Sequence, residues 1–183
     1  GPEGRVRRGP AIERETLENA ADLRLDDKPV EVVDRVWTTG EISDRSEPEG
    51  RSLHHHVLQN GTFVPDPYED DLSVVLDVGE GRGFVVCGCC HAGLLNTLDH
   101  IRTHLFPPIV GIVGGTHMVN ADLDVRASTI GRLQDLDALQ TLWLGHCSGK
   151  PFMCEVAESF EESVVRKVGA GYSIKVTLDR TFG

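Results

Sequence analysis

Residues 84–93 read FVVCGCCHAG, and this stretch decides how the rest of the chain is interpreted. An apolar run typical of a buried strand ends in a glycine-rich turn, and the turn holds Cys89, Cys90 and His91. Leucines recur at three- and four-residue intervals after Gly93, which is the spacing of one helical face. The stretch therefore predicts a strand, a tight turn and a helix start that present His91 at the end of the strand.

Working outward from this turn, the sequence predicts alternating strands and helices. Apolar β-branched runs indicate strands, and leucines in helical phase indicate helices between them. The resulting order, β-β-α-β-α-β-α-β, predicts a layered α/β fold. The predicted strands are 72–78, 83–88, 109–115, 141–146 and 172–178, and the predicted helices are 92–105, 126–140 and 151–162.

The N-terminal part of the chain is more polar. We expect residues 1–29 to form a lead-in segment with a weakly buried helix over 11–24, and residues 30–183 to form the folded unit. One or two short strands are predicted within 30–40, and a loop over 41–56. A chain of 183 residues suits one domain of ordinary size.

Composition excludes some classes of partner. The formal net charge of −11 argues against nucleic acid and anionic membranes, because polyanions repel an acidic surface. The sequence contains no apolar run of membrane-spanning length and no secretory signal, so a cytoplasmic location is expected. The cysteine count of five is odd, and three of these residues are too close in sequence for disulfide geometry. Metal binding or thiol chemistry is therefore the favoured use.

Three predicted strands each deliver a histidine just past their carboxyl end. His91, His117 and His146 occupy these places, and glycines flank all three. Ligands collect at the carboxyl ends of strands in open α/β sheets, and neutral imidazole is a good zinc ligand. A shared metal site is one interpretation; separate structural roles for three strand-end histidines is the other. The pattern alone leaves both open.

The remaining histidines and acidic residues are weaker candidates. Residues 54–56 read His-His-His; neighbouring side chains of an extended segment point to opposite faces, so we interpret them as a solvated loop from which one could line the pocket. His100 and His104 have a helical spacing but lack the intervening glutamate of a zinc-protease motif, so a structural role is favoured. The acidic turn over 66–71 is expected to be solvated, with the rim of the site as the alternative.

The cysteines divide by their surroundings. Cys87 is expected in the core, and Cys154 is expected to pack within a helix. Cys89, Cys90 and Cys147 stand beside the candidate histidines, where a metal would lower a thiol pKa. A thiol-based sensor built on these three residues is a further alternative.

Three segments, taken together, resemble a known family. GCCHAGLLNTLDHI (88–101), IVGIVGGTHM (109–118) and GHCSG (145–149) resemble the metallo-hydrolases of the metallo-β-lactamase fold, in particular the ribofuranosylaminobenzene 5′-phosphate synthase-like branch. The resemblance implies an αββα sandwich with zinc, manganese or iron at one edge. It implies that His91 and His146 bind the metal. For His117 it implies a role as a ligand, as a supporting partner of a ligand or as a substrate contact, and we expect it to be the catalytic residue that steadies charge developing on the substrate. It also implies substrate-binding or supporting roles for Cys89, Cys90, Gly114, Gly115, Cys147 and Ser148.

The sequence departs from the family pattern in one important respect. The main metal motif of the family, His-x-His-x-Asp-His, does not occur in this chain. We therefore expect residues 30–183 to be the C-terminal half of the sandwich, which would pair with the missing N-terminal half or form a homo-oligomer. The predicted function is metal-dependent hydrolase-like chemistry on a small phosphoester or phosphoribosyl compound. The alternative is a non-catalytic subunit or remnant that depends on a partner.

Overall fold

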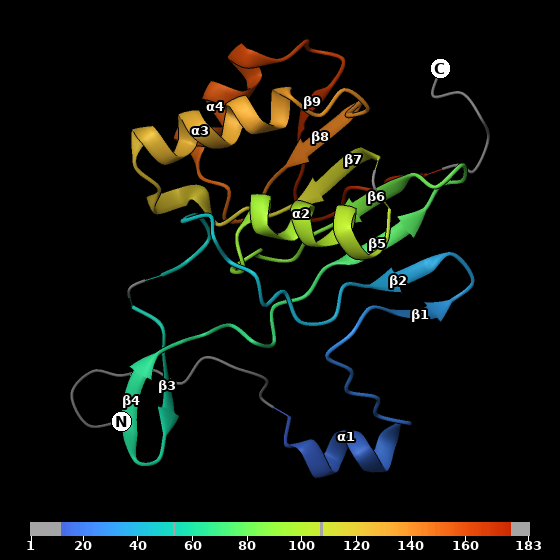
Figure 1. The fold of residues 1–183 in the computed structure, drawn as a ribbon, viewed down its shortest axis with the longest axis vertical. Helices are drawn as coiled ribbons and strands as arrows, with labels where there is room; N and C mark the ends of the chain where they lie inside the picture. Colours follow the sequence, from blue (N-terminus) through green and yellow to red (C-terminus); the bar gives the residue numbers. More distant parts are fainter. Residues whose placement is uncertain (1–11, 53, 107, 177–183) are drawn as a thin grey trace.

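The chain forms a seven-stranded mixed sheet with helices packed against it, and a separate two-stranded hairpin (Figure 1). The structure is a computed structural model that describes residues 12–52, 54–106 and 108–176. No helix in these ranges is long and apolar enough to cross a membrane. The α/β class predicted from the sequence is confirmed.

The larger sheet has an antiparallel half and a parallel half. Its strand order is β1-β2-β5-β6-β7-β8-β9; β1 to β6 pair antiparallel, and β6 to β9 pair parallel. Parallel neighbours need long crossovers, which the helices supply, whereas the glycine-rich turn between β5 and β6 makes a hairpin. The strands are β1 (Val30–Val33), β2 (Val36–Thr38), β5 (Val74–Asp77), β6 (Gly83–Val86), β7 (Ile109–Gly114), β8 (Thr141–Leu144) and β9 (Val165–Lys167).

Three helices cover one face of the sheet and form the main hydrophobic core with it. They are α2 (Leu94–His104), α3 (Leu123–Gln134) and α4 (Lys150–Ser159); a short 3-10 helix, η2 (Met118–Asn120), precedes α3. Side chains alternate along β8, so its two leucines enter this core while Trp143 faces the other side of the sheet. The core includes the fully buried side chains of Leu94, Ile112, Leu133, Leu142 and Phe152.

The opposite face of the sheet carries a smaller apolar cluster. Phe84 and Val110 are buried there, and Ile174 and Val176 of the C-terminal segment pack against it. The predicted strand over 172–178 is therefore wrong for residues 172–176, which are irregular; residues 177 and 178 lie outside the described ranges. The last strand is β9 instead, because Val165 reaches the main core beside β8 while the segment around Ile174 crosses the second face.

The second sheet is a hairpin that was not among the predicted elements. It consists of β3 (His56–Gln59) and β4 (Thr62–Pro65), paired antiparallel. Asn60 and Gly61 connect them with φ values of 49° and 78°, the left-handed conformation that a two-residue hairpin turn of type I′ requires. The predicted loop over 41–56 thus ends one residue early, because His56 already belongs to β3.

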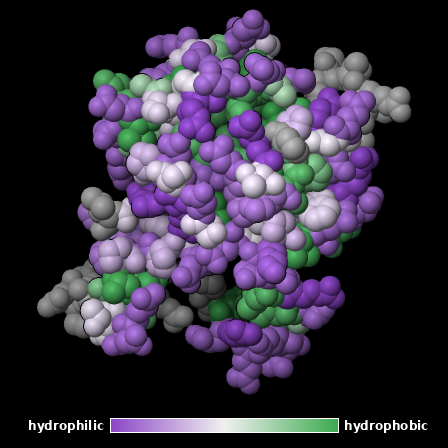
Figure 2. Space-filling model, in the orientation of Figure 1, coloured by the Kyte–Doolittle hydropathy of each residue, from purple (hydrophilic) through white to green (hydrophobic). Residues whose placement is uncertain are grey.

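The N-terminal helix α1 (Arg14–Ala20) is shorter than the predicted range of 11–24 and has no buried residue, as expected for a weakly buried helix. Residue 11 lies outside the described ranges. The face of the molecule in Figure 2 is largely hydrophilic, with apolar residues scattered over it rather than joined in one patch. This surface agrees with the net charge of −11.

A buried carboxyl from a distant loop takes the place of a helix cap on α2. The N-cap residue, Gly93, has no side chain, and Glu49 accepts a hydrogen bond from the main-chain N–H of Leu95 at 2.5 Å. Glu49 is 2% exposed, and burial raises the pKa of its carboxyl. Its second oxygen, Oε2, is buried with no partner among the described residues. Glu49 therefore holds the start of α2, immediately after the turn that carries His91.

Replacing Glu49 tests this arrangement. Glu49→Ala should lower the free energy of unfolding by about 1 kcal/mol, the usual cost of losing a helix cap. Glu49→Gln keeps the acceptor and removes the charge. Because the folded-state pKa of Glu49 lies above its unfolded value, its protonated form stabilises the fold at low pH, and this stabilisation is lost as the pH rises through the raised pKa. In urea unfolding at several pH values, the stability of Glu49→Gln relative to the natural chain should increase as the pH rises above 4.5; a constant difference would contradict the assignment.

Candidate metal centre

The turns that follow β6, β7 and β8 meet at one edge of the sheet. These strands are parallel, so their carboxyl ends lie together. Main-chain hydrogen bonds join the turns directly: Gly115 N–H donates to Gly88 O, and Gly145 N–H donates to Gly114 O, both at 3.0 Å. These hydrogen bonds therefore hold the three turns together as one unit at this edge of the sheet.

Each of the three turns holds a non-glycine residue in the left-handed region. Cys90, His117 and His146 have φ values of 61°, 46° and 52°. This conformation costs roughly 1–3 kcal/mol for each residue, and such strain gathers where the chain must place side chains for function. The left-handed residue in each motif turns the chain sharply at the end of its strand.

One group of potential metal ligands consists of Cys89, His146 and Cys147. Their ligand atoms all lie within 4.8 Å of one another, and Cys89 Sγ lies 2.8 Å from His146 Nε2. Cys147 S–H donates to Cys89 O at 3.3 Å. Burial raises the pKa of the Cys147 thiol to about 11, so this thiol is protonated at neutral pH when no cation is bound. We call these three residues the cysteine–histidine group.

A second group consists of imidazoles and one phenol. The ring centroids of His91 and His117 are 4.3 Å apart, and His55 lies 5.4 Å from His91 and 6.2 Å from His117. Tyr68 stacks on His91 at 4.7 Å, and its hydroxyl lies 2.9 Å from His55 Nδ1. We call His55, His91 and His117 the imidazole group.

Burial lowers the pKa of both His91 and His117, so these rings favour the neutral form that can bind a metal. For His117, the neighbouring His91 and His55 lower the pKa further. His117 Nδ1 is buried and has no hydrogen-bond partner among the described residues. The main-chain N–H of His117 donates to Cys147 Sγ at 3.3 Å, so the imidazole group adjoins the cysteine–histidine group.

The structure thus divides the predicted site residues. His91 and His117 come together in one group, and His146 joins Cys89 and Cys147 in the other. Gly114 and Gly115 allow the turns to pack closely, because a Cβ atom on Gly115 would lie 2.6 Å from Gly88 O. Their predicted role in binding or supporting a substrate stays a prediction.

Two predicted residues at the edge of the site lie inside the protein instead. Cys90 is 1% exposed within the main core, where its Sγ lies 3.4 Å from Thr97 Oγ1. Its hydrogen bond with Cys87 and its burial raise the pKa of its thiol. The left-handed turn at Cys90 sends its side chain inward and that of Cys89 outward. Ser148 is fully buried as well, so neither residue is placed to touch a substrate.

Sequence reasoning allowed one histidine of the 54–56 run to line the pocket but did not single out His55, and it missed Tyr68. In the His-His-His run, His54 and His56 are exposed as predicted, whereas His55 is half-buried against the site. The alternation of an extended chain contains a signal for this, because the middle residue of a triplet faces away from its two neighbours. Nothing local to Tyr68 marks it as part of the site.

The remaining candidate histidines and cysteines lie outside both groups. His100 Nε2 lies 3.0 Å from Thr39 O, and its ring is 4.6 Å from that of His104, in keeping with the predicted structural role. Cys87 lies in the core, as predicted. The prediction that Cys154 packs inside the protein is wrong, because its position on α4 turns it to solvent.

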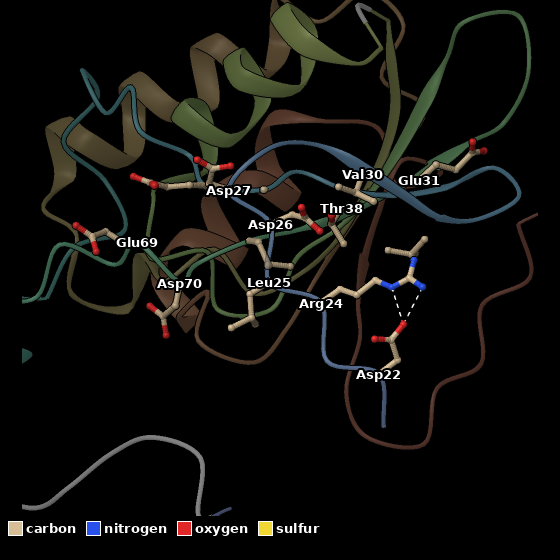
Figure 3. A pocket seen from close by; sticks show the side chains of 14 residues that line it. Asp22, Arg24, Leu25, Asp26, Asp27, Val30, Glu31, Thr38, Glu69 and Asp70 are labelled. Atoms are coloured by element: carbon tan, nitrogen blue, oxygen red, sulfur yellow. Dashed lines mark hydrogen bonds and ion pairs between the residues drawn. The ribbon is translucent and has the colours of Figure 1, made fainter. Parts of the chain in front are cut away.

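The acidic turn over 66–71 contributes to two places. Asp66 and Asp71 accept main-chain hydrogen bonds from Tyr68 and Ala92, both at 2.8 Å, and so support the imidazole group. Glu69 and Asp70 instead line an open cavity of about 750 Å³ with carboxylates of the lead-in segment (Figure 3). Among the described residues that line it, Arg24 is the one cationic residue, and it is paired with Asp22. The described lining is therefore acidic and includes no histidine.

Two known proteins are similar to this chain. No family model matches the chain. It is 28% identical over 148 residues to the 7,8-dihydropterin-6-methyl-4-(β-D-ribofuranosyl)-aminobenzene-5′-phosphate synthase of Methanocaldococcus jannaschii, covering 76% of this chain and 50% of that protein. The crystal structure of Tm1679, described as a metal-dependent hydrolase of the β-lactamase superfamily, superimposes with a TM-score of 0.70 at 21% identity.

The chain has a metallo-β-lactamase fold. The superposition covers 81% of this chain and 56% of Tm1679, so the chain spans about half the length of both proteins. The resemblance inferred from the three motifs, including the synthase-like branch, is therefore confirmed as a likeness.

Proposed function

We propose that this chain supplies a divalent metal site for hydrolase-type chemistry on a small phosphoester or phosphoribosyl compound. The observation that carries the proposal is the cysteine–histidine group, whose ligand atoms lie within 4.8 Å of one another at the carboxyl edge of the sheet. The two similar proteins support the proposal, since one is described as a metal-dependent hydrolase and the other is a synthase of a 5′-phosphate compound.

The residues present fit a metal ion. Two thiols and an imidazole are ligands that suit zinc, and three protein ligands leave a position open, as catalytic zinc sites do. His146 keeps its predicted role as a ligand, and Cys89 and Cys147 become ligands rather than neighbours. Because the Cys147 thiol is protonated when no ion is bound, binding must release its proton. Metal affinity should therefore rise with pH.

A bound divalent ion would lower the pKa of its bound water and polarise a substrate oxygen. The remaining residues bind and orient the substrate. α4 begins directly after the third turn, and helix N-termini favour phosphate. Lys150, the first residue of α4 and four residues after His146, adds an exposed positive charge. The roles predicted for His91 as a ligand and for His117 as a catalytic residue stay proposals.

A partner-dependent subunit is the second candidate. It is favoured by the half-length coverage of the similar proteins and by the lack of a His-x-His-x-Asp-His string in the sequence. A partner or a second copy that covered the sheet face around Phe84 would have to displace Ile174 and Val176, which already pack against it.

Metal analysis together with activity measurements tests both candidates. The purified chain is loaded with zinc, manganese or iron(II), dialysed and analysed for elements; we expect at least one tightly held equivalent. Hydrolysis of p-nitrophenyl phosphate and its diester is then measured with and without an added N-terminal half that carries the missing motif. Hydrolysis by the chain alone supports the enzyme, and hydrolysis only with the added half supports the subunit. A chain that holds no metal and remains inactive in both assays would overturn the proposed function.

A further inference from the structure

We propose that Cys89 and Cys147 form a reversible disulfide, so that oxidation of this pair removes the metal site and reduction restores it. The pair connects the turn after β6 with the turn after β8 and uses two of the three members of the cysteine–histidine group. The bond itself is independent of the proposed function, whereas its effect on the site rests on the metal binding proposed for this group.

The two sulfurs are close enough to bond after a small movement. All the ligand atoms of the cysteine–histidine group, both sulfurs included, lie within 4.8 Å of one another. Cys147 Sγ also lies 3.3 Å from the main-chain oxygen of Cys89, so it is near the backbone of its partner as well as the side chain. A disulfide bond is about 2.05 Å long, so the sulfurs must approach by less than about 3 Å. A change of the χ1 rotamer of Cys89 moves its sulfur by about that distance.

The surrounding turns already hold the two cysteines together. Gly115 N–H donates to the main-chain oxygen of Gly88, the residue before Cys89. A Cβ atom on Gly115 would lie 2.8 Å from Cys147 Sγ, so the glycine leaves the room that this sulfur occupies. The main-chain N–H of His117 donates to the same sulfur at 3.3 Å. The disulfide would therefore join turns that are already in contact, and the sheet need not open for it to form.

Exposure distinguishes this pair from the other cysteines. Cys89 and Cys147 are half-buried, so a small oxidant reaches them. The thiols of Cys87 and Cys90 also interact through a hydrogen bond, but these residues are 7% and 1% exposed and belong to the main core. Cys154 is exposed on α4, outside both pairs. Oxidation of the folded chain should therefore bridge the pair at the sheet edge and spare the pair in the core.

A small disulfide such as oxidised glutathione is the class of oxidant that this step needs. Cys89 Sγ attacks one sulfur of the oxidant and releases the other half as a thiolate, which takes the Cys89 proton by way of His146 Nε2, 2.8 Å from Cys89 Sγ. Cys147 Sγ then attacks Cys89 Sγ, and the second glutathione leaves with the Cys147 proton. Two protein thiols thus become one disulfide while one oxidant molecule becomes two thiols.

The disulfide and a bound ion exclude one another. Cysteine binds zinc as a thiolate, and a disulfide has no thiolate to offer. Once the bridge forms, His146 is all that remains of the cysteine–histidine group. Conversely, an ion held by both sulfurs keeps them from attacking the oxidant. The redox state of the surroundings would therefore decide whether the site is able to hold metal.

Thiol counting tests the inference in Cys154→Ser, which removes the exposed thiol that could link two chains. Of the five cysteines, four then remain. The reduced, metal-free chain is incubated with oxidised glutathione, unfolded, counted for free thiols and mapped as peptides without reductant. We expect two free thiols, Cys87 and Cys90, and one peptide pair that joins Cys89 to Cys147. The zinc-loaded chain should keep all four thiols over the same period. The bridged chain should bind cobalt(II) at least about 100-fold more weakly, and dithiothreitol should restore the binding.

Cys147→Ser, added to this chain, is the matched control. It should stop at the first step, with one glutathione attached to Cys89 and no bridge; circular dichroism establishes that it is folded. A metal-free chain that keeps all four thiols, or that bridges Cys87 to Cys90 instead, would overturn the proposal. If such a chain still binds cobalt(II) with thiolate absorption, the proposed function stands and only the disulfide fails. If the bridge forms but the reduced chain binds no metal, the control of the site fails together with the proposed function.

Discussion

A chain in which Cys89 and Cys147 are both replaced by serine is expected to lose its tight metal site. Loss of a hydrogen bond that merely supports a ligand lowers metal affinity about 10–100-fold, so removing two direct ligands should lower it by at least about 100-fold. Serine hydroxyls are close to cysteine thiols in size but do not ionise near neutral pH. In the variant only His146 remains of the cysteine–histidine group.

The measurement is competition for zinc with a chromophoric chelator, together with the cobalt(II) spectrum. The double variant should lose the thiolate-to-cobalt absorption that the natural chain shows. Cys154→Ser is the matched control, because Cys154 is an exposed free cysteine on α4, outside the cysteine–histidine group. A double variant that kept both the zinc affinity and the absorption would show that these thiols are not ligands. His91→Ala should leave the absorption intact if the imidazole group takes no part in binding this ion.

The fold was predictable because its signals are local. The strand, turn and helix around FVVCGCCHAG follow from an apolar run, from glycines and from leucines at helical spacing. The same pattern of an apolar run ending in glycine recurs at Gly114 and Gly145. Parallel strands then bring the three turns to one edge without any further information. The Asn60-Gly61 turn of the missed hairpin was also a local signal, and one of the strongest for a β-hairpin.

The division of donors was not predictable, because it depends on side-chain direction. Cys89 and Cys90 are neighbours of identical chemistry, yet a φ of 61° at Cys90 sends one thiol to His146 and the other into the core. His55 reaches His91 only through a long-range packing of loops around Tyr68. A sequence indicates which residues follow a strand, whereas the backbone angles of the turn decide what each of them touches.

The last strand shows a similar limit. YSIKVTL has better strand periodicity than the segment around Val165, yet the short segment forms β9. Tertiary packing decides between them: Val165 joins the main core, while Ile174 and Val176 cover the second face of the sheet. In this case, tertiary packing outweighs the strand propensity of the sequence.

Gly114→Ala is expected to be the most damaging single substitution for the fold. Gly114 has a φ of +133°, which side chains rarely permit, and a Cβ atom there would lie 2.1 Å from Cys87 O. That oxygen is main-chain at the end of β6, so a flexible side chain cannot move aside to make room. The strands would have to separate where the three turns are joined. We expect a loss of more than about 4 kcal/mol in the free energy of unfolding, within the range reserved for strained or overpacked positions.

The matched control is Gly131→Ala in α3. A Cβ atom at Gly131 would meet no atom within 4 Å, and alanine is the better helix former by roughly 0.5–1 kcal/mol. Urea unfolding followed by circular dichroism should therefore show one glycine-to-alanine change destabilising and the other stabilising. Since whole domains are stable by only about 5–15 kcal/mol, Gly114→Ala should also raise the fraction of insoluble chain on expression. An unfolding free energy within about 1 kcal/mol of the natural chain would mean that the turns are not packed as closely as this edge requires, and the metal geometry built on them would fail with it.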